Sequence, residues 1–300
     1  MKLATTTGDF EEYTSSQLEA IEYISKSGFK YLDYNFCMDY RHKTGIYSDG
    51  DFNLYLESVL KKCDETGVKF VQAHAPMGIS FGRNDEKFIE DTKKSIDASK
   101  ILGIKNIVVH TERYENTDKD DTIKKNKEFF IPILEHAKKH NINILVENFN
   151  RIWKEGAYWI DNAFDLKEFV EYVNHPNLKI VWDTGHGNLK DTSPYDALCH
   201  LGDYVYGLHV QDNRGFKDDH TAPFFGTLDI DSLMKGLIEI GYNGYFTFEA
   251  SNIFAPSNLK SDENKNGPLY KLPLEFKIKM ENMLYEIGKH ILTTYNVFED

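Results

Sequence analysis

Histidine and aspartate residues gather at the end of one predicted strand. The segment Tyr206–Gln211 alternates apolar and polar side chains, which is typical of a strand, and it carries His209 toward its C-terminal end. The polar segment that follows contains Asp212, Asp218 and His220 within eleven residues of His209. Imidazole nitrogens and carboxylate oxygens are donors to divalent metals. The pattern therefore predicts a metal site at a strand end.

Five other predicted strands carry a metal-capable or acid/base-capable side chain at the same end. In chain order these are His74, His110, Glu147, Asp183 and Glu249. One such residue alone is more often a hydrogen-bonded polar side chain than a metal ligand. Six such residues at the same end of six strands, however, favour metal ligands over isolated polar side chains. Glu147 and Asp183 lie in apolar runs, where an unpaired carboxylate is costly or is forced neutral, and a bound cation would remove this cost.

The eleven histidines fall into two sets. Five point to one end of the predicted strands, and these are His74, His110, His186, His209 and His220. His186 enters this set because it follows Asp183 by three residues in the string WDTGH. The other six fall on predicted helices or on loops elsewhere, and we expect them to be surface residues without a common geometry: His42, His136, His140, His175, His200 and His290.

The composition narrows the class of protein. The 300 residues include 35 basic and 48 acidic ones, and the net charge of −13 disfavours a nucleic-acid or anionic-membrane partner. The three cysteines lack CxxC spacing, which is typical of a reducing compartment. No stretch approaches the ~20 apolar residues of a membrane-spanning helix, and no signal-length apolar run is present. We therefore expect a soluble, cytoplasmic protein.

Short strand-like segments alternate with helix-length segments along the chain. The eight strand-like segments are Lys2–Thr7, Tyr31–Phe36, Phe70–Ala75, Asn106–Thr111, Asn143–Asn148, Leu178–Thr184, Val205–Asp212 and Tyr245–Ser251. The segments between them space apolar residues by three and four, as amphipathic helices do. Eight such repeats predict an α/β fold, a (β/α)8 TIM barrel, with a single domain over residues 1–300. Two long loops, 149–163 and 252–272, would cover the C-terminal face.

Short strings placed on these strands carry a family resemblance. They are AHAPMG from Ala73, LGIKNIVVH from Leu102, ILVEN from Ile144, WDTGH from Trp182, LHVQDN from Leu208, DDHTAPFFGTLD from Asp218 and GYNGYFTFEAS from Gly241. Through them nearly the whole chain resembles the sugar isomerase/epimerase-like TIM barrels of the xylose-isomerase-like (AP endonuclease family 2) superfamily. Relatives in that superfamily include ketose 3-epimerases, inosose dehydratases and endonuclease IV.

The resemblance implies two alternative ligand sets. Similarity to the ketose 3-epimerases implies one divalent metal on Glu147, Asp183, His209 and Glu249, with His186 contacting the substrate. Similarity to endonuclease IV implies three zinc ions on a larger set, which adds His74, His110, His186, Asp218 and His220. The acidic charge and the lack of basic DNA-gripping loops disfavour the second alternative. The smaller, oxygen-rich set suits Mn²⁺, Mg²⁺ or Co²⁺, whereas a site with more histidines favours Zn²⁺.

These residues lead to a hypothesis about function. We expect a divalent-metal-dependent isomerase or epimerase of a small carbohydrate, a ketose, aldose or polyol derivative, that acts through a metal-stabilised enediolate. Glu147 and Glu249 would move the proton, and His186 would stabilise the oxyanion. The further residues expected to contact the substrate are His74, His110, Trp153, Arg214 and Phe36.

Other reactions stay open on the same residues. A metal-dependent lyase of the inosose dehydratase type would use the same cation and base, and a zinc-dependent phosphodiesterase of the endonuclease IV type is a third alternative. The sequence leaves open which sugar is used, whether it is phosphorylated, and whether it is isomerised, epimerised or dehydrated. The resemblance also implies pairing of two copies, with Tyr270–Tyr295 as the segment that would form the interface.

Overall fold

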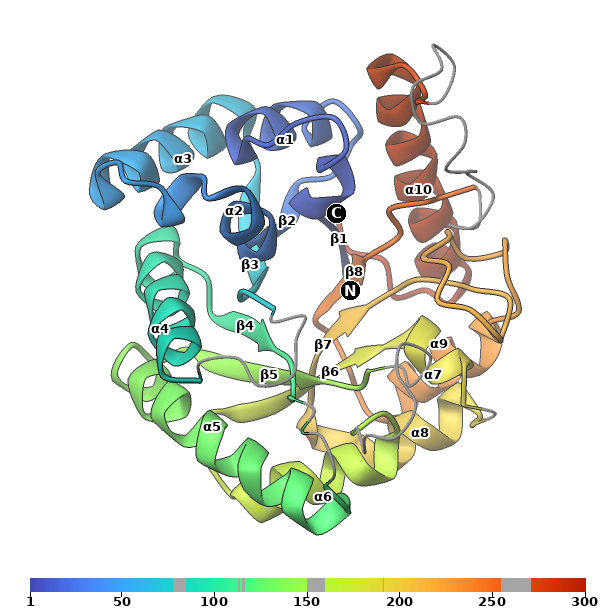
Figure 1. The fold of residues 1–300 in the computed structure, drawn as a ribbon. Coiled ribbons are helices and arrows are strands. Elements are labelled where there is room, and N and C mark those ends of the chain that lie inside the picture. The colour runs from blue at the N-terminus through green and yellow to red at the C-terminus, as the bar shows by residue number, and fades with distance from the viewer. Residues whose placement is uncertain (78–84, 113, 115–116, 150–159, 191, 255–270) are drawn as a thin grey trace.

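A ring of eight parallel strands organises the molecule. The computed structural model describes residues 1–77, 85–112, 114, 117–149, 160–190, 192–254 and 271–300 (Figure 1). The strands are β1 (Lys2–Thr6), β2 (Tyr31–Asn35), β3 (Lys69–His74), β4 (Asn106–Val109), β5 (Asn143–Glu147), β6 (Leu178–Asp183), β7 (Val205–His209) and β8 (Tyr245–Phe248). Their order is β7-β6-β5-β4-β3-β2-β1-β8, so neighbours in sequence are neighbours in the sheet.

The ring closes just beyond the end of β7. Val210 forms an isolated parallel bridge to Phe248 of β8. The Val210 N–H donates to the carbonyl oxygen of Thr247 at 2.7 Å, and the Glu249 N–H donates to the carbonyl oxygen of Val210 at 3.1 Å. The predicted (β/α)8 TIM barrel is confirmed.

Helices surround the ring (Figure 1). They are α1 (Gln17–Ile24), α2 (Phe36–His42), α3 (Phe52–Thr66), α4 (Asp85–Leu102), α5 (Lys119–Lys139), α6 (Ala163–Val173), α7 (Thr184–Asn188), α8 (Pro194–Leu201), α9 (Ile230–Glu239) and α10 (Leu274–Thr294). Short 3-10 helices span Thr7–Phe10 (η1), Gly45–Tyr47 (η2) and Gly202–Tyr204 (η3). No helix among the described residues is long and apolar enough to cross a membrane.

The strands β7 and β8 end earlier than the sequence predicts. They stop at His209 and Phe248, three residues before the expected ends at Asp212 and Ser251. Asp212 instead forms an antiparallel bridge with Thr221, and this bridge folds the β7–α9 connection back over the strand ends. Because β7 and β8 end early, the residues that follow them form the rim of the barrel mouth.

Candidate metal centre

The pleat of the strands brings the predicted site residues together. The interior of the barrel contains a small buried apolar cluster made of Val108, Leu145 and Val181. Side chains two residues apart on a strand face the same side. The residues two positions further along the chain are His110, just beyond the end of β4, Glu147 of β5 and Asp183 of β6. An apolar layer on β4, β5 and β6 therefore supports a layer of ionisable groups directly above it.

Four predicted ligands form one group at the barrel mouth, called here the strand-end group. Its members are Glu147 of β5, Asp183 of β6, His209 of β7 and Glu249, which follows β8. One ligand atom of each lies within 4.8 Å of the others. His209 Nδ1 lies 3.0 Å from Glu147 Oε1 and 3.2 Å from Glu249 Oε2. Three members are buried and the Glu249 side chain is 24% exposed, so the group opens outward through Glu249.

Negative charge is in excess within the strand-end group. Burial raises the pKa of Asp183 to about 7, and the nearby carboxylates of Glu147 and Glu249 add to this rise. Burial also opposes the ionisation of Glu147, but His209 and other nearby histidines hold its pKa well below its usual range. The oxygen Oδ2 of Asp183 is buried and accepts no hydrogen bond. A divalent cation would satisfy this oxygen and offset the repulsion, so the residues fit a metal.

A second group, called here the Asp218 group, consists of His186 of α7 with Asp218 and His220 of the β7–α9 connection. Asp218 Oδ2 lies 3.3 Å from His186 Nε2 and 3.2 Å from His220 Nε2. Its other oxygen accepts a hydrogen bond from Gln211 Nε2 at 2.8 Å. Burial lowers the pKa of His220, but Asp218 more than offsets this and raises it to about 10. In the Asp218 group, each imidazole therefore has a carboxylate partner in Asp218.

The two groups touch through His186. Its Nδ1 lies 3.4 Å from Glu147 Oε1 and 3.6 Å from Asp183 Oδ1. The same nitrogen is 2.9 Å from the carbonyl oxygen of Asn148, which accepts its hydrogen bond. Burial opposes protonation of His186, yet the carboxylates of Asp183 and Asp218 raise its pKa well above the usual range.

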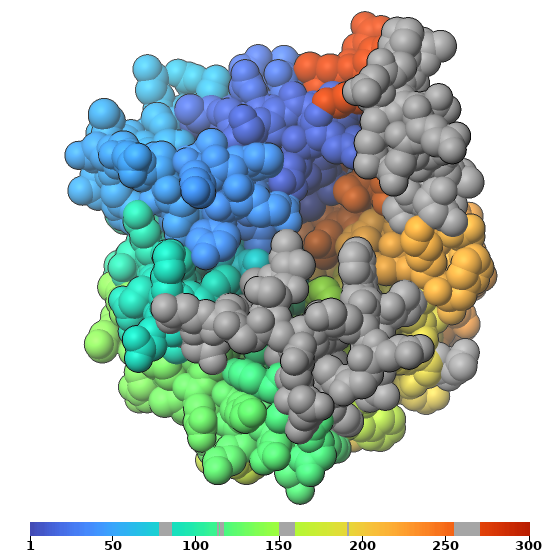
Figure 2. Space-filling model, in the orientation of Figure 1, coloured from blue at the N-terminus to red at the C-terminus, as the bar shows by residue number. Residues whose placement is uncertain are grey.

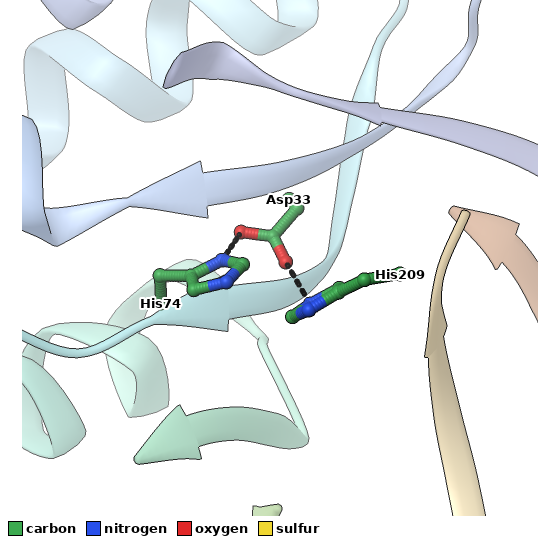
Figure 3. A group of neighbouring side chains, drawn as sticks. All are labelled: Asp33, His74 and His209. Carbon is green, nitrogen blue, oxygen red and sulfur yellow. Dashed lines mark hydrogen bonds and ion pairs between the residues drawn. The ribbon is translucent and has the colours of Figure 1, made fainter. Parts of the chain in front are cut away.

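A buried acid that the sequence analysis missed lies below the strand-end group. Asp33 of β2 is 3.0 Å from His74 Nδ1 and 4.0 Å from His209 Nε2, so both imidazoles face it (Figure 3). Gln72 Nε2 donates to Asp33 at 2.7 Å and lies 2.9 Å from His209 Nε2. Gly207 leaves room for this amide, since a Cβ there would meet Gln72 Oε1 at 2.6 Å. Asp33 thus orients His74 and, with Gln72, His209.

The position of Asp33 sets the charge of His74. Burial lowers the pKa of His74, but the Asp33 carboxylate outweighs burial and raises it to about 10. His74 Nε2 lies 3.9 Å from Glu249 Oε1 and is buried without a hydrogen-bond partner. An acidic residue inside the apolar string YLDYN is the sequence signal that would have revealed Asp33, as it did for Glu147.

His110 reaches the strand-end group from the side of β4. Its Nε2 lies 2.8 Å from Glu147 Oε2, without the alignment of a hydrogen bond. Its ring meets the edge of Phe149 with centroids 5.3 Å apart, and the Phe149 ring also approaches His186 at 5.0 Å. Phe149, which no earlier inference singled out, therefore forms an apolar side of the barrel mouth.

Two residues expected to contact the substrate stand apart from these groups. Phe36 is fully buried with its ring 4.4 Å from that of Tyr34, so it belongs to the core and not to the expected substrate wall. Arg214 is held by Asp219 at 2.8 and 3.0 Å and stacks on Phe216. Trp153 lies outside the described residues, as does most of the loops 149–163 and 252–272.

Asp212 has a structural role in the rim. Its carboxylate accepts hydrogen bonds from the N–H groups of Asn213, Gly226 and Leu228 at 2.8 to 3.0 Å. These bonds hold the ends of the β7–α9 connection together. Asp212 is therefore not part of the metal site at which the sequence pattern placed it.

The expectation for the remaining histidines was wrong for three of them. His136 and His140 share one partner, Asp97, so they do have a common geometry. The His175 side chain is only 8% exposed and lies 3.4 Å from Glu135. The first arrangement joins α4 to α5, and the second joins α5 to the connection between α6 and β6.

A cavity of about 570 Å³ opens beside the two groups. Its lining includes His220 and Glu249 together with Thr6, Asp9, Tyr13 and Asn35. In the space-filling view, the N-terminal part of the chain, in blue, and the part around β8, in dark orange, border a hollow in this face (Figure 2). The cavity gives a ligand access to Glu249, the most exposed member of the strand-end group.

The chain matches the family model described as xylose isomerase-like TIM barrel over residues 21–264. It is 26% identical over 168 residues to the uncharacterized protein y4fM of Sinorhizobium fredii, a match that spans 54% of this chain and 52% of that protein. The chain thus aligns with about half the length of this relative. It is 24% identical to the D-psicose 3-epimerase of Ruminiclostridium cellulolyticum over 80% of both chains.

A solved structure shows the same fold over nearly the whole chain. The crystal structure of IOLI protein with a binding zinc atom superimposes with a TM-score of 0.74 at 18% identity. The superposition covers 98% of this chain and 99% of that one.

Proposed function

Because the chain belongs to the xylose isomerase-like TIM barrel family, we propose that it is a divalent-metal-dependent isomerase or epimerase of a small carbohydrate. The strand-end group carries this proposal, since glutamates from the ends of β5 and β8 both approach His209. The similarity to a D-psicose 3-epimerase over 80% of both chains supports the same class of substrate.

The strand-end group would hold the cation. Three carboxylates and one imidazole form an oxygen-rich set that suits Mn²⁺, Mg²⁺ or Co²⁺. When bound, such an ion polarises a sugar carbonyl and makes the neighbouring C–H more acidic.

Glu147 and Glu249 are the proposed acid/base pair. One carboxylate would take the proton from the carbon next to the carbonyl, and the other would return a proton to the substrate enediolate. Return to the opposite face gives the epimer, and return to the neighbouring carbon gives the isomer. Their environments differ, because Glu147 is buried while Glu249 is partly exposed and lines the cavity. Two carboxylates in different environments are suited to different protonation roles.

The histidines would bind the sugar as donors. Burial lowers the pKa values of His74 and His220, but their acidic partners outweigh burial and raise both values to about 10. Both imidazoles are therefore protonated near neutral pH. His74 Nε2 has no hydrogen-bond partner, so it can donate to a sugar oxygen on which negative charge develops. His186 Nε2 and His220 Nε2 both face Asp218 Oδ2, so either would exchange that bond for one to the sugar.

Proton NMR in D2O tests the proposal. Purified protein supplied with Mn²⁺ would be incubated with a panel of free ketoses, aldoses and inososes. We expect one C–H signal to disappear by exchange with deuterium while an isomer or epimer of unchanged composition accumulates. Loss of water from the substrate would instead assign a lyase, and the absence of exchange across the whole panel would contradict the proposal.

A pair of matched variants tests the role of Glu147. Glu147→Gln should abolish exchange, whereas Glu128→Gln, the same substitution at an exposed position of α5, should leave it intact. Full turnover by a Glu147→Gln protein that still binds metal would contradict the two-carboxylate mechanism.

A further inference from the structure

A further set of metal-capable side chains lies on the outside of the barrel. Asp97 of α4 faces His136 of α5 and His140, the residue that caps the C-terminal end of α5. Asp97 Oδ1 lies 2.7 Å from His136 Nε2 and 3.1 Å from His140 Nε2. All three side chains are partly exposed, at 45%, 22% and 28%. Two imidazoles and a carboxylate therefore converge on one point that water can reach.

The backbone explains this convergence. His136 and His140 are four residues apart, so they lie one turn apart on the same face of the helix. Their rings contact edge to face with centroids 5.0 Å apart. α4 and α5 lie side by side on the outer ring, which places Asp97 opposite this pair (Figure 1). The packing of α4 against α5 thus holds the two imidazoles and the carboxylate close together.

The distances suit a small dication. Zinc–nitrogen and zinc–oxygen bonds of about 2.0–2.1 Å in a tetrahedron separate neighbouring ligand atoms by roughly 3.3 Å. To reach this spacing from Asp97 Oδ1, His136 Nε2 would move outward by about 0.6 Å and His140 Nε2 by about 0.2 Å. Partial exposure of all three side chains leaves room for water as a fourth ligand.

The electrostatic surroundings combine opposing effects, because Lys138 and Lys139 add positive charge to the last turn of α5 while the helix end itself attracts a cation. The C-terminal end of a helix carries the negative end of its dipole, and His140 stands at that end of α5. The nearby cation Lys93 is paired with Glu90 at 2.7 Å, so its charge is offset. Two imidazoles with one carboxylate are a donor set typical of Zn²⁺, Cu²⁺ and Ni²⁺, in contrast to the oxygen-rich strand-end group.

From these contacts we infer that Asp97, His136 and His140 form a second metal site, specific for a transition-metal dication such as Zn²⁺, which ties α4 to α5. α5 ends at Lys139 and β5 begins at Asn143, so the site lies at the N-terminal end of the strands. The proposed active site occupies the opposite end. The site would stabilise the scaffold, because in TIM barrels the chemistry lies at the C-terminal face and the N-terminal face serves stability.

Zinc binding by equilibrium dialysis tests this inference. Wild-type protein, cleared of metal with a chelator and dialysed against Zn²⁺, is compared with a His136→Ala/His140→Ala variant. We expect the double variant to bind one zinc fewer per chain and to keep its turnover. Asp97→Asn should weaken the same site at least about ten-fold, since even outer partners of metal ligands contribute that much.

The control is His290→Ala, which removes an exposed histidine from α10 and should leave the zinc stoichiometry unchanged. Circular dichroism establishes that each variant is folded, and alanine is well tolerated in a helix. Equal zinc stoichiometry in the folded double variant and the wild type would overturn the inference. So would loss of the same zinc in His290→Ala.

Discussion

The strand-end group and the Asp218 group are neighbours at the barrel mouth, and they satisfy their charges in opposite ways. The strand-end group has three carboxylates for one imidazole, and Asp183 Oδ2 is buried without a partner. The Asp218 group has one carboxylate between two imidazoles, so its carboxylate is fully compensated. Residue types alone make both groups look like ligand sets, but only one has a deficit of positive charge.

This difference decides how many cations the mouth requires. Burying like charges together is costly unless a cation joins them, whereas a buried carboxylate between two protonated imidazoles is already compensated. We therefore expect one cation in the strand-end group and none in the Asp218 group. A three-zinc arrangement would have to displace the protons that now pair His186 and His220 with Asp218.

The largest expected effect is that of Asp183→Asn. The amide keeps the shape of the side chain but removes a charge that the cation needs, so metal should be lost and turnover should fall about 10³-fold or more. Asp203→Asn, an exposed position in η3, is the matched control. Kinetics and metal analysis on the same samples provide the measurement. Unchanged metal content in Asp183→Asn would refute the difference between the two groups.

Asp218→Asn should have an intermediate effect. Metal content should stay unchanged, while turnover falls about 10- to 100-fold, because His220 loses the main partner that keeps it protonated and His186 loses one of two. Asp218 raises the pKa of His220 to about 10, so wild-type activity should decline only as pH rises toward that value. Without Asp218, burial dominates and the alkaline limb should move down toward the ordinary pKa of histidine. A pH–rate profile in which the limb does not move would contradict this role.

Asp33→Asn should have the smallest effect. Asp33 reaches the proposed ligand His209 through Gln72, which is hydrogen-bonded to Asp33 and lies 2.9 Å from His209 Nε2. Loss of Asp33 should therefore weaken metal affinity only about ten-fold. It should also lower the pKa of His74, since burial is then opposed only by the more weakly acting carboxylates of Glu249 and Glu147. A metal titration together with histidine NMR measures both quantities. A His74 pKa that stays near 10 in the variant would exclude Asp33 as its cause.

The sequence predicted most of the mouth because strand periodicity is local. A polar residue at the end of an apolar run is visible without knowing the fold, and the barrel then brings Glu147, Asp183 and Glu249 together. Asp33 was missed because it lies in the middle of its strand and not at the end, although its apolar neighbours in sequence match those of Glu147.

Contacts that depend on side-chain packing were not predictable in the same way. Phe36 was expected at a strand end, but Asn35 accepts a hydrogen bond from the Met38 N–H and starts a helix there, which turns Phe36 into the core. Asp97 meets His136 only because of the rotation of α4 against α5, and no sequence period reports that rotation. The local sequence pattern therefore predicts which side chains the strands place at the barrel mouth. Which side chains the helices and connections bring into contact depends on tertiary packing.

Metal stoichiometry measured by plasma mass spectrometry is the most direct test of the central claim that the strand-end group binds one cation. The protein would carry His136→Ala/His140→Ala, so that the outer site does not contribute, and would be purified without chelator or affinity metal. We predict about one equivalent of Mn, Co or Mg per chain, lost in Asp183→Asn and kept in Asp218→Asn. Two or three zinc equivalents, loss of metal in Asp218→Asn, or no metal even after reconstitution would contradict the account.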